Sequence, residues 1–214
     1  MKIVLLQFVD PEEVRKPHLM VNLYNLTTNS WKQIDYGDII QVEYDRASHY
    51  FQLFFNGACH WDLKHGGSDS MYTFLCFDVS TEVLRWLEYP PDIPMKYGWR
   101  SLFVVNGRLA VVWYANWEEV PRPIVIWVMK EYGVKESWFK HSVIEPFEDY
   151  FYPFLPWKNE WLLLDKAEGD KIDQLVSCSF HSNELKKYQI YGQGKTFRAL
   201  FYKESLISLD QLIN

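Results

Sequence analysis

Several residues of this 214-residue chain have the side chains and spacing that catalysis or metal binding would use. Cys59 and His60 are adjacent, as a nucleophile and its base could be, and Cys178 and His181 are spaced like a metal-binding pair. In a strand, however, adjacent residues point to opposite faces, and so do residues three apart. A closed zinc site also needs four ligands, and no second cluster accompanies Cys178. We therefore expect no metal site, and we expect a buried Cys59 beside a partly exposed His60.

Two further sequence patterns are similar to a phosphate-binding loop and to an acid–base catalytic pair, but each lacks a feature that such a site requires. The segment from Gly192 to Thr196 is similar to the tail of a phosphate loop, but the first glycine of that motif would have to stand where this chain has Gln189. The carboxylate pairs Glu118-Glu119 and Glu148-Asp149 could serve acid–base catalysis. No apolar pocket that would raise a carboxyl pKa is evident beside them, so solvated turns are the simpler interpretation. The sequence predicts neither catalytic residues nor a cofactor.

A protein-binding surface is the role that remains for these loops. Residues 115–123 combine an aromatic anchor with acidic neighbours, and with prolines that limit the entropy lost on binding. Residues 145–150 add a second acidic segment, and loops on a rigid scaffold are where recognition concentrates. We predict that a basic protein contacts Trp117, Glu118, Glu119, Glu148 and Asp149. In the alternative interpretation, Trp117 folds back and caps the scaffold.

The elements that position these loops follow an internal repeat of about fifty residues. One half of the repeat is an apolar strand, a polar turn and a large apolar residue that anchors the next strand. The anchors lie 53, 54 and 47 residues apart and are Trp31, Leu84, Trp138 and Leu185. The apolar strands before them cover residues 21–26, 74–79, 124–129 and 175–180.

The other half of the repeat is a tight hairpin. Asn56-Gly57 joins the apolar runs 50–55 and 58–63, and Asn106-Gly107 joins 101–105 and 108–114. Asn-Gly supplies the positive φ angles of a type I′ turn and is the strongest short-range hairpin signal. Similar pairs of runs are 151–155 with 161–165, and 197–202 with 205–209. The repeat therefore holds four strands in ~50 residues, the length of kelch-type propeller blades.

This repeat predicts an all-β fold, a kelch-like β-propeller or part of one, with about three complete four-stranded blades and two half blades. The complete blades are expected at residues 50–88, 100–144 and 150–190, and the half blades at 20–35 and 196–209. We expect a lead-in at residues 1–19, the propeller-like domain at 20–209 and a tail at 210–214. The half blades could pair and close a small ring, or the chain could be a section of a larger propeller with open edges. Glu131 to Trp138 is expected to be a hairpin loop.

Composition limits the classes of partner. Aromatic residues make up 18% of the chain, and they favour half-buried sheets. The net charge of −6 argues against nucleic acid, whose phosphates require a basic surface, and it suits a basic protein. No apolar stretch reaches the ~20 residues of a membrane helix. The three scattered cysteines indicate a reducing, cytoplasmic setting, in which no disulfide framework forms.

At these same residues the chain resembles the associated domain of plant F-box proteins, and within it the S-locus F-box branch. The stretches that carry the resemblance are Phe55 to Trp61, Phe77 to Glu82, Ile126 to Trp138, and Tyr202 to Leu206. The block from Trp127 to Trp138 is the most specific of them. The resemblance extends from about Val21 to Leu209.

The resemblance implies a substrate receptor of a cullin-type ubiquitin ligase, a non-enzymatic role in which the associated domain captures the protein to be ubiquitinated. In the S-locus branch that target is the S-RNase, a basic secreted ribonuclease of the pistil, met during pollen self-incompatibility. The Skp-like adaptor binds an F-box, and none precedes residue 20. The adaptor and cullin are therefore expected as partners only if an F-box is present elsewhere. The alternatives are an F-box-less competing binder, an F-box-type receptor with an unrelated target, and, third, a propeller enzyme.

Overall fold

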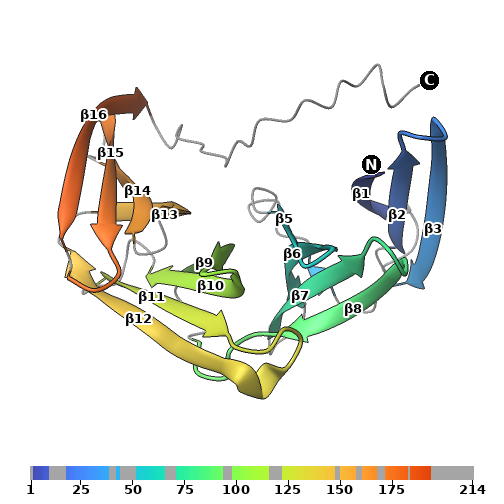
Figure 1. Cartoon of the computed structure of the whole chain (residues 1–214), viewed down its shortest axis with the longest axis horizontal. Coiled ribbons are helices and arrows are strands. Elements are labelled where there is room, and N and C mark those ends of the chain that lie inside the picture. Colours follow the sequence, from blue (N-terminus) through green and yellow to red (C-terminus); the bar gives the residue numbers. More distant parts are fainter. Residues whose placement is uncertain are drawn as a thin grey trace.

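In a computed structural model of the chain, the strands form four antiparallel sheets that follow one another along an arc (Figure 1). The structure describes residues 2–9, 18–38, 42–43, 52–65, 71–93, 98–115, 122–147, 150–157, 161–167, 172–182 and 184–193. Within these ranges the only helix is a 3₁₀ turn at Lys135–Ser137. The all-β, propeller-like prediction is confirmed.

Each sheet is built from consecutive strands, and the later strands lie toward the outside of the arc (Figure 1). The first sheet contains β1 (Lys2–Val9), β2 (His18–Asn25) and β3 (Ser30–Asp38). The second contains β4 (Val42–Glu43), β5 (Gln52–Phe55), β6 (Ala58–His65), β7 (Met71–Asp78) and β8 (Val83–Glu88). The third contains β9 (Gly98–Val105), β10 (Arg108–Ala115), β11 (Arg122–Met129) and β12 (Trp138–Phe147). The fourth contains β13 (Tyr150–Trp157), β14 (Trp161–Ala167), β15 (Ile172–Ser179) and β16 (Leu185–Gln193).

The two Asn-Gly hairpins form where the sequence predicts them. Asn56 and Gly57 have φ angles of 49° and 76°, and Asn106 and Gly107 have φ angles of 49° and 70°. Positive φ at both central residues is the geometry of a type I′ turn, which matches the twist of the strands it joins. These turns fix the register of β5 on β6 and of β9 on β10.

The middle sheets are buried on both faces, which explains their almost continuous apolar strands. On β10, Val111 packs in the core between the second and third sheets, whereas Val112 packs in the core between the third and fourth. Both residues are fully buried. Successive strand residues point to opposite faces, so a sheet enclosed by two neighbours favours apolar side chains on both faces.

The first sheet differs from its prediction. Residues 2–9, which we expected to belong to a lead-in, form β1, and β1 pairs with β2 along its whole length. The first sheet therefore has three strands rather than the two of a half blade. The second expected half blade, residues 196–209, lies outside the described residues, so the domain limit at 209 and the closure of the ring stay predictions.

Trp31 also differs from the other anchors. Its side chain is 59% exposed, whereas Trp138 at the corresponding position of the third sheet is 8% exposed. Trp31 stacks on Tyr24 at a ring-centroid distance of 4.9 Å. No described sheet packs on that face of the first sheet, which is why its anchor is exposed.

Consecutive sheets are joined at their outer strands, at contacts that we call seams. At the seam of the first and second sheets, the Tyr36 hydroxyl on β3 donates to the Glu82 carbonyl oxygen at 2.7 Å. At the seam of the third and fourth, the Ser142 hydroxyl on β12 donates to the Phe180 carbonyl oxygen. In both, the outer strand of one sheet bonds to the turn between the last two strands of the next sheet. The repeat thus extends to the polar contacts between sheets.

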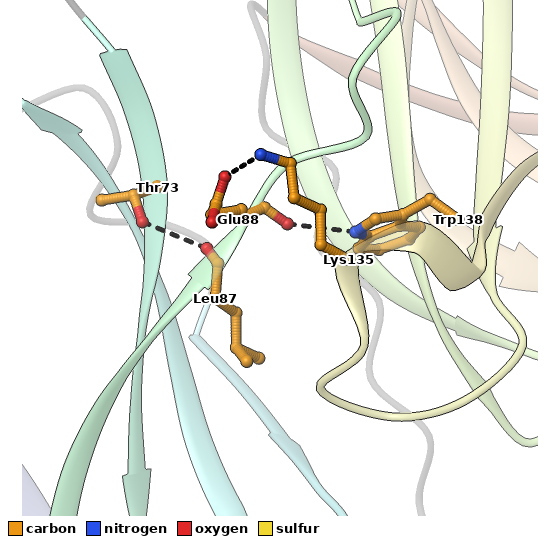
Figure 2. Close-up of polar contacts among 5 residues, drawn as sticks. All are labelled: Thr73, Leu87, Glu88, Lys135 and Trp138. Carbon is orange, nitrogen blue, oxygen red and sulfur yellow. Dashed lines mark hydrogen bonds and ion pairs between the residues drawn. The ribbon is translucent and has the colours of Figure 1, made fainter.

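The middle seam uses the expected hairpin loop at residues 131–138 (Figure 2). The Trp138 indole N–H donates to the Glu88 carbonyl oxygen at 3.0 Å, and the Lys135 ammonium pairs with the Glu88 carboxylate. The Thr73 hydroxyl donates to the Leu87 carbonyl oxygen at 3.1 Å, which holds β7 against β8 beside this contact. The loop therefore fastens the third sheet to the second.

Candidate protein-binding surface

All five predicted contact residues, Trp117, Glu118, Glu119, Glu148 and Asp149, lie outside the described residues, so their contacts stay predictions. The strand ends that bound them are described. Residues 116–121 connect β10 to β11, and residues 148–149 connect β12 to β13. Arg122, which follows the first connection, pairs with Phe147, which precedes the second. The structure therefore brings the bases of both acidic loops to the same end of the third sheet.

That end of the propeller is bounded by the same kinds of connection in every sheet. The connections between β1 and β2, β6 and β7, β10 and β11, and β14 and β15, and those between one sheet and the next, start and finish there. In sequence they cover residues 10–17, 39–41, 44–51, 66–70, 89–97, 116–121, 148–149 and 168–171, with twelve acidic residues against five basic ones. Acidic charge is thus concentrated in the connections of one end.

The opposite end carries short turns with local hydrogen bonds. The Asp78 carboxylate accepts from the Ser80 amide at 2.9 Å and from the Thr81 amide at 2.8 Å, and the Asn25 side chain accepts from the Thr27 amide at 3.0 Å in the same place of the first sheet. The Ser80 hydroxyl also donates to the Asp78 carboxylate at 2.6 Å, and this bond, followed by the amide bonds, holds the pKa of Asp78 well below its usual range. Asp78 is therefore engaged in shaping a turn.

The adjacent Cys59 and His60 point to different sheets, as strand geometry requires. Cys59 packs toward the first sheet, and burial raises the pKa of its thiol to about 11. His60 is fully buried on the face toward the third sheet, and Cys59 is only half-buried. The prediction of a buried cysteine beside a partly exposed histidine is therefore wrong for both residues. A thiol that stays protonated and faces away from its neighbouring imidazole is a poor nucleophile.

His60 belongs instead to a buried polar cluster that the sequence did not reveal. Its Nδ1 lies 3.2 Å from the Leu53 carbonyl oxygen, and its Nε2 lies 2.8 Å from the Tyr132 hydroxyl. The Cys76 thiol is 3.2 Å from the same hydroxyl. These contacts fit a neutral imidazole that donates from Nδ1 and accepts at Nε2. Burial lowers the pKa of His60, which agrees with that form.

Cys178 and His181 do not form a site together. Cys178 is fully buried, and burial raises the pKa of its thiol to about 12, whereas His181 is exposed in the turn before β16. Among the described residues no group of three His, Cys, Asp or Glu side chains is placed to hold a metal ion. His181 does lie near His141 of the third sheet, at a ring-centroid distance of 6.3 Å. This contact crosses the seam of the third and fourth sheets.

The described part of the chain contains no helix long and apolar enough to cross a membrane.

Comparison with known proteins gives two matches. A family profile described as "F-box associated beta propeller domain" matches residues 1–210. An F-box protein of Arabidopsis thaliana is 27% identical over 136 residues, which cover 61% of this chain and 30% of that protein. The chain therefore matches less than a third of the relative's length.

Proposed function

Because the chain belongs to the F-box associated beta propeller domain family, we propose that it captures a protein substrate for a cullin-type ubiquitin ligase. The observation that carries this proposal is the placement of two acidic loops at one end of the third sheet, where Arg122 pairs with Phe147. Loops that emerge side by side from paired strands can contact one partner together. A rigid sheet beneath them limits the entropy lost on binding.

The partner that fits this end is a basic protein. The connections there carry twelve acidic and five basic residues, and opposite potentials raise the rate of encounter and disfavour wrong partners. Trp117, between an asparagine and two glutamates, supplies the aromatic anchor that dominates many interfaces. A basic secreted ribonuclease of the S-RNase kind, captured in the cytoplasm of the pollen tube, is the specific partner that we propose.

A binding role is also favoured over an enzymatic one by the state of the thiols. Burial raises the pKa values of Cys59, Cys76 and Cys178, so each stays protonated near neutral pH. The buried imidazole of His60 is occupied by its contacts with Leu53 and Tyr132. These groups pack in or against the cores between the sheets and offer no reactive atom to a substrate.

The test reverses charge at matched sites on the two ends. Glu118→Lys with Glu119→Lys, and separately Glu148→Lys with Asp149→Lys, change the charge of the acidic end. Glu131→Lys with Glu136→Lys makes the same change at two exposed residues of the opposite end. Capture of a basic ribonuclease should weaken, and depend less on salt, in the first two variants alone, because charges at an interface rim govern association. Equal binding by all three variants would refute the proposal.

Delivery to the ligase is tested separately from capture. The chain is co-precipitated with a Skp-like adaptor and a cullin in the presence of the ribonuclease. A ternary complex supports substrate delivery. Capture of the ribonuclease without the adaptor supports instead a competing binder that holds the target and does not deliver it.

A further inference from the structure

The seam of the third and fourth sheets differs from the other two in the side chains beside its hydrogen bond. At the first and middle seams that bond is accompanied by a lysine–glutamate ion pair across the same contact. At the third seam the bond joins Ser142 to Phe180, and the neighbouring residues, His141 and His181, are both histidines. Their rings lie 6.3 Å apart between centroids and are nearly perpendicular, at 83°. Two imidazoles do not attract each other as opposite charges do, so an ion held between them would supply that attraction.

A β-bulge directs His141 to this contact. Ser142 pairs with Ile126, but Lys140 already pairs with Trp127, so His141 is an extra residue without a register partner on β11. Bulges re-aim a side chain and are frequent next to functional sites. Here the bulge turns an imidazole of β12 toward the turn between β15 and β16, which lies against β12 (Figure 1).

The His141 ring is held in place and has one nitrogen to offer. The Phe139 and Phe180 rings pack edge-to-face against it, at centroid distances of 6.0 and 6.1 Å. Its Nε2 atom is buried and makes no hydrogen bond within the described residues. A buried polar atom in a native protein is expected to have a partner, such as a water molecule or an ion. Burial lowers the pKa of His141, which favours the neutral imidazole that binds metal ions.

His181 supplies a second imidazole from the exposed side of the seam. Its backbone N–H donates to the Ser179 hydroxyl oxygen at 3.2 Å, which fixes its position in the turn before β16. The side chain is exposed, so water can reach the contact and complete the coordination of an ion. Cys178, three residues earlier, is fully buried in the core between the third and fourth sheets and is not available to the same ion.

We propose that His141 and His181 bind one transition-metal ion of the Zn²⁺ type across this seam. Imidazole nitrogen is a ligand of zinc, copper and nickel, and Zn–N bonds of about 2.0–2.1 Å bridge this separation after a small rotation of the exposed His181 ring. Water fills the remaining positions, since two protein ligands leave the site open. The ion fastens the fourth sheet to the third, as the lysine–glutamate pairs do at the other seams.

Titration with Zn²⁺, followed by isothermal titration calorimetry, tests the site. The wild type should bind one Zn²⁺ ion here, and His141→Gln and His181→Gln should each weaken this binding at least about tenfold. His181 is exposed, so His181→Gln keeps the test decisive if His141→Gln does not fold. The matched control is His18→Gln, at a histidine on β2 of the first sheet, which should bind Zn²⁺ as the wild type does.

The acidic connections are the competing site for a divalent cation, and Mg²⁺ identifies them. Because Mg²⁺ prefers carboxylate oxygens to imidazole, its binding should be the same in the wild type and in His181→Gln. Equal binding of Zn²⁺ by these two proteins would overturn the proposal, and so would a loss in His18→Gln as large as that in His181→Gln.

Thermal unfolding tests whether the ion joins the two sheets. An ion that binds only the folded chain should raise Tm by about 5–11 °C when its concentration is 100 times its Kd. The wild type should show this rise, and His181→Gln should not. Binding of Zn²⁺ without a rise in Tm would mean that the ion does not require the assembled seam, and the bridge would then be refuted.

Discussion

Removal of the Tyr132 hydroxyl tests the buried polar cluster most directly. This hydroxyl donates to His60 Nε2 at 2.8 Å and lies 3.2 Å from the Cys76 thiol, and so it joins the loop of the third sheet to the core of the second. Tyr132→Phe removes this hydroxyl and keeps the ring, with its contacts to Phe55 at 5.8 Å and to the His60 ring at 5.7 Å. The variant therefore isolates one polar group.

The expected cost follows from the burial of His60. With the hydroxyl gone, a fully buried imidazole nitrogen loses its partner, and an unsatisfied buried acceptor costs about 1–3 kcal/mol. The Cys76 thiol, 3.6 Å from the same nitrogen, is close enough to replace part of the lost bond, which places the expected loss in the lower half of that range. For a chain of this size each kcal/mol lowers Tm by about 2–4 °C.

The measurement is urea unfolding of the wild type and of Tyr132→Phe, followed by tryptophan fluorescence, with a double-mutant cycle against Cys76→Ala. We expect a lower midpoint at an unchanged slope, and a larger cost of Tyr132→Phe when Cys76 is already alanine. A loss of stability below about 0.5 kcal/mol in both backgrounds would refute the role assigned to the hydroxyl, because no buried acceptor would then have been left unpaired.

Three other predictions use the turns and the seams. Trp138→Phe removes the indole donor to Glu88 and should cost about 1 kcal/mol in urea unfolding, whereas Lys135→Met on the exposed ion pair should change stability by less than about 1 kcal/mol. Gly57→Ala should cost about 1–2 kcal/mol, since nothing crowds the added Cβ and the φ of +76° alone opposes it; an unchanged midpoint would contradict a type I′ turn. Burial, and to a smaller extent the charge of His181, lowers the pKa of His141 in the folded protein below 6.5. The unfolded chain therefore binds a proton at His141 more readily, so stability is full above pH 6.5 and falls as the pH drops toward the folded pKa. His141→Gln should flatten the loss of stability between pH 7 and pH 5, and an identical pH profile would exclude the effect.

The hairpins could be predicted from the sequence because their signals are local. Asn56-Gly57 and Asn106-Gly107 specify turn geometry through two residues each, and the repeat of about fifty residues sets the number of strands in each sheet. β1 was missed because eight residues separate it from its partner, β2, without a tight turn that would mark a hairpin.

The burial of Cys59 and His60 could not be predicted, for a different reason. Along β6 apolar residues alternate with His60, Asp62 and Lys64, and this pattern is typical of a half-exposed strand, so the sequence favours an exposed His60. The partner of His60 is 72 residues away, and the neighbour of His141 is 40 residues away, so only the packing of whole sheets reveals these contacts. The two acidic segments, residues 116–121 and 148–149, were recognised from composition alone. The strand pairing adds that both start from the same end of the third sheet.

The direction of the seam bonds has a consequence for synthesis on the ribosome. In each seam bond, one partner is translated well before the other. The acceptor of Tyr36 lies 46 residues further along the chain, the donor to the Glu88 carbonyl 50 residues further, and the acceptor of Ser142 38 residues further. Each newly made sheet therefore waits with one apolar face uncovered until most of the next sheet has been translated. At ~5–20 residues per second this interval lasts several seconds, long enough for chaperones to bind. A slow codon cluster anywhere in the next sheet before its seam residue would lengthen this exposure, whereas a cluster after that residue would leave the seam bond already formed.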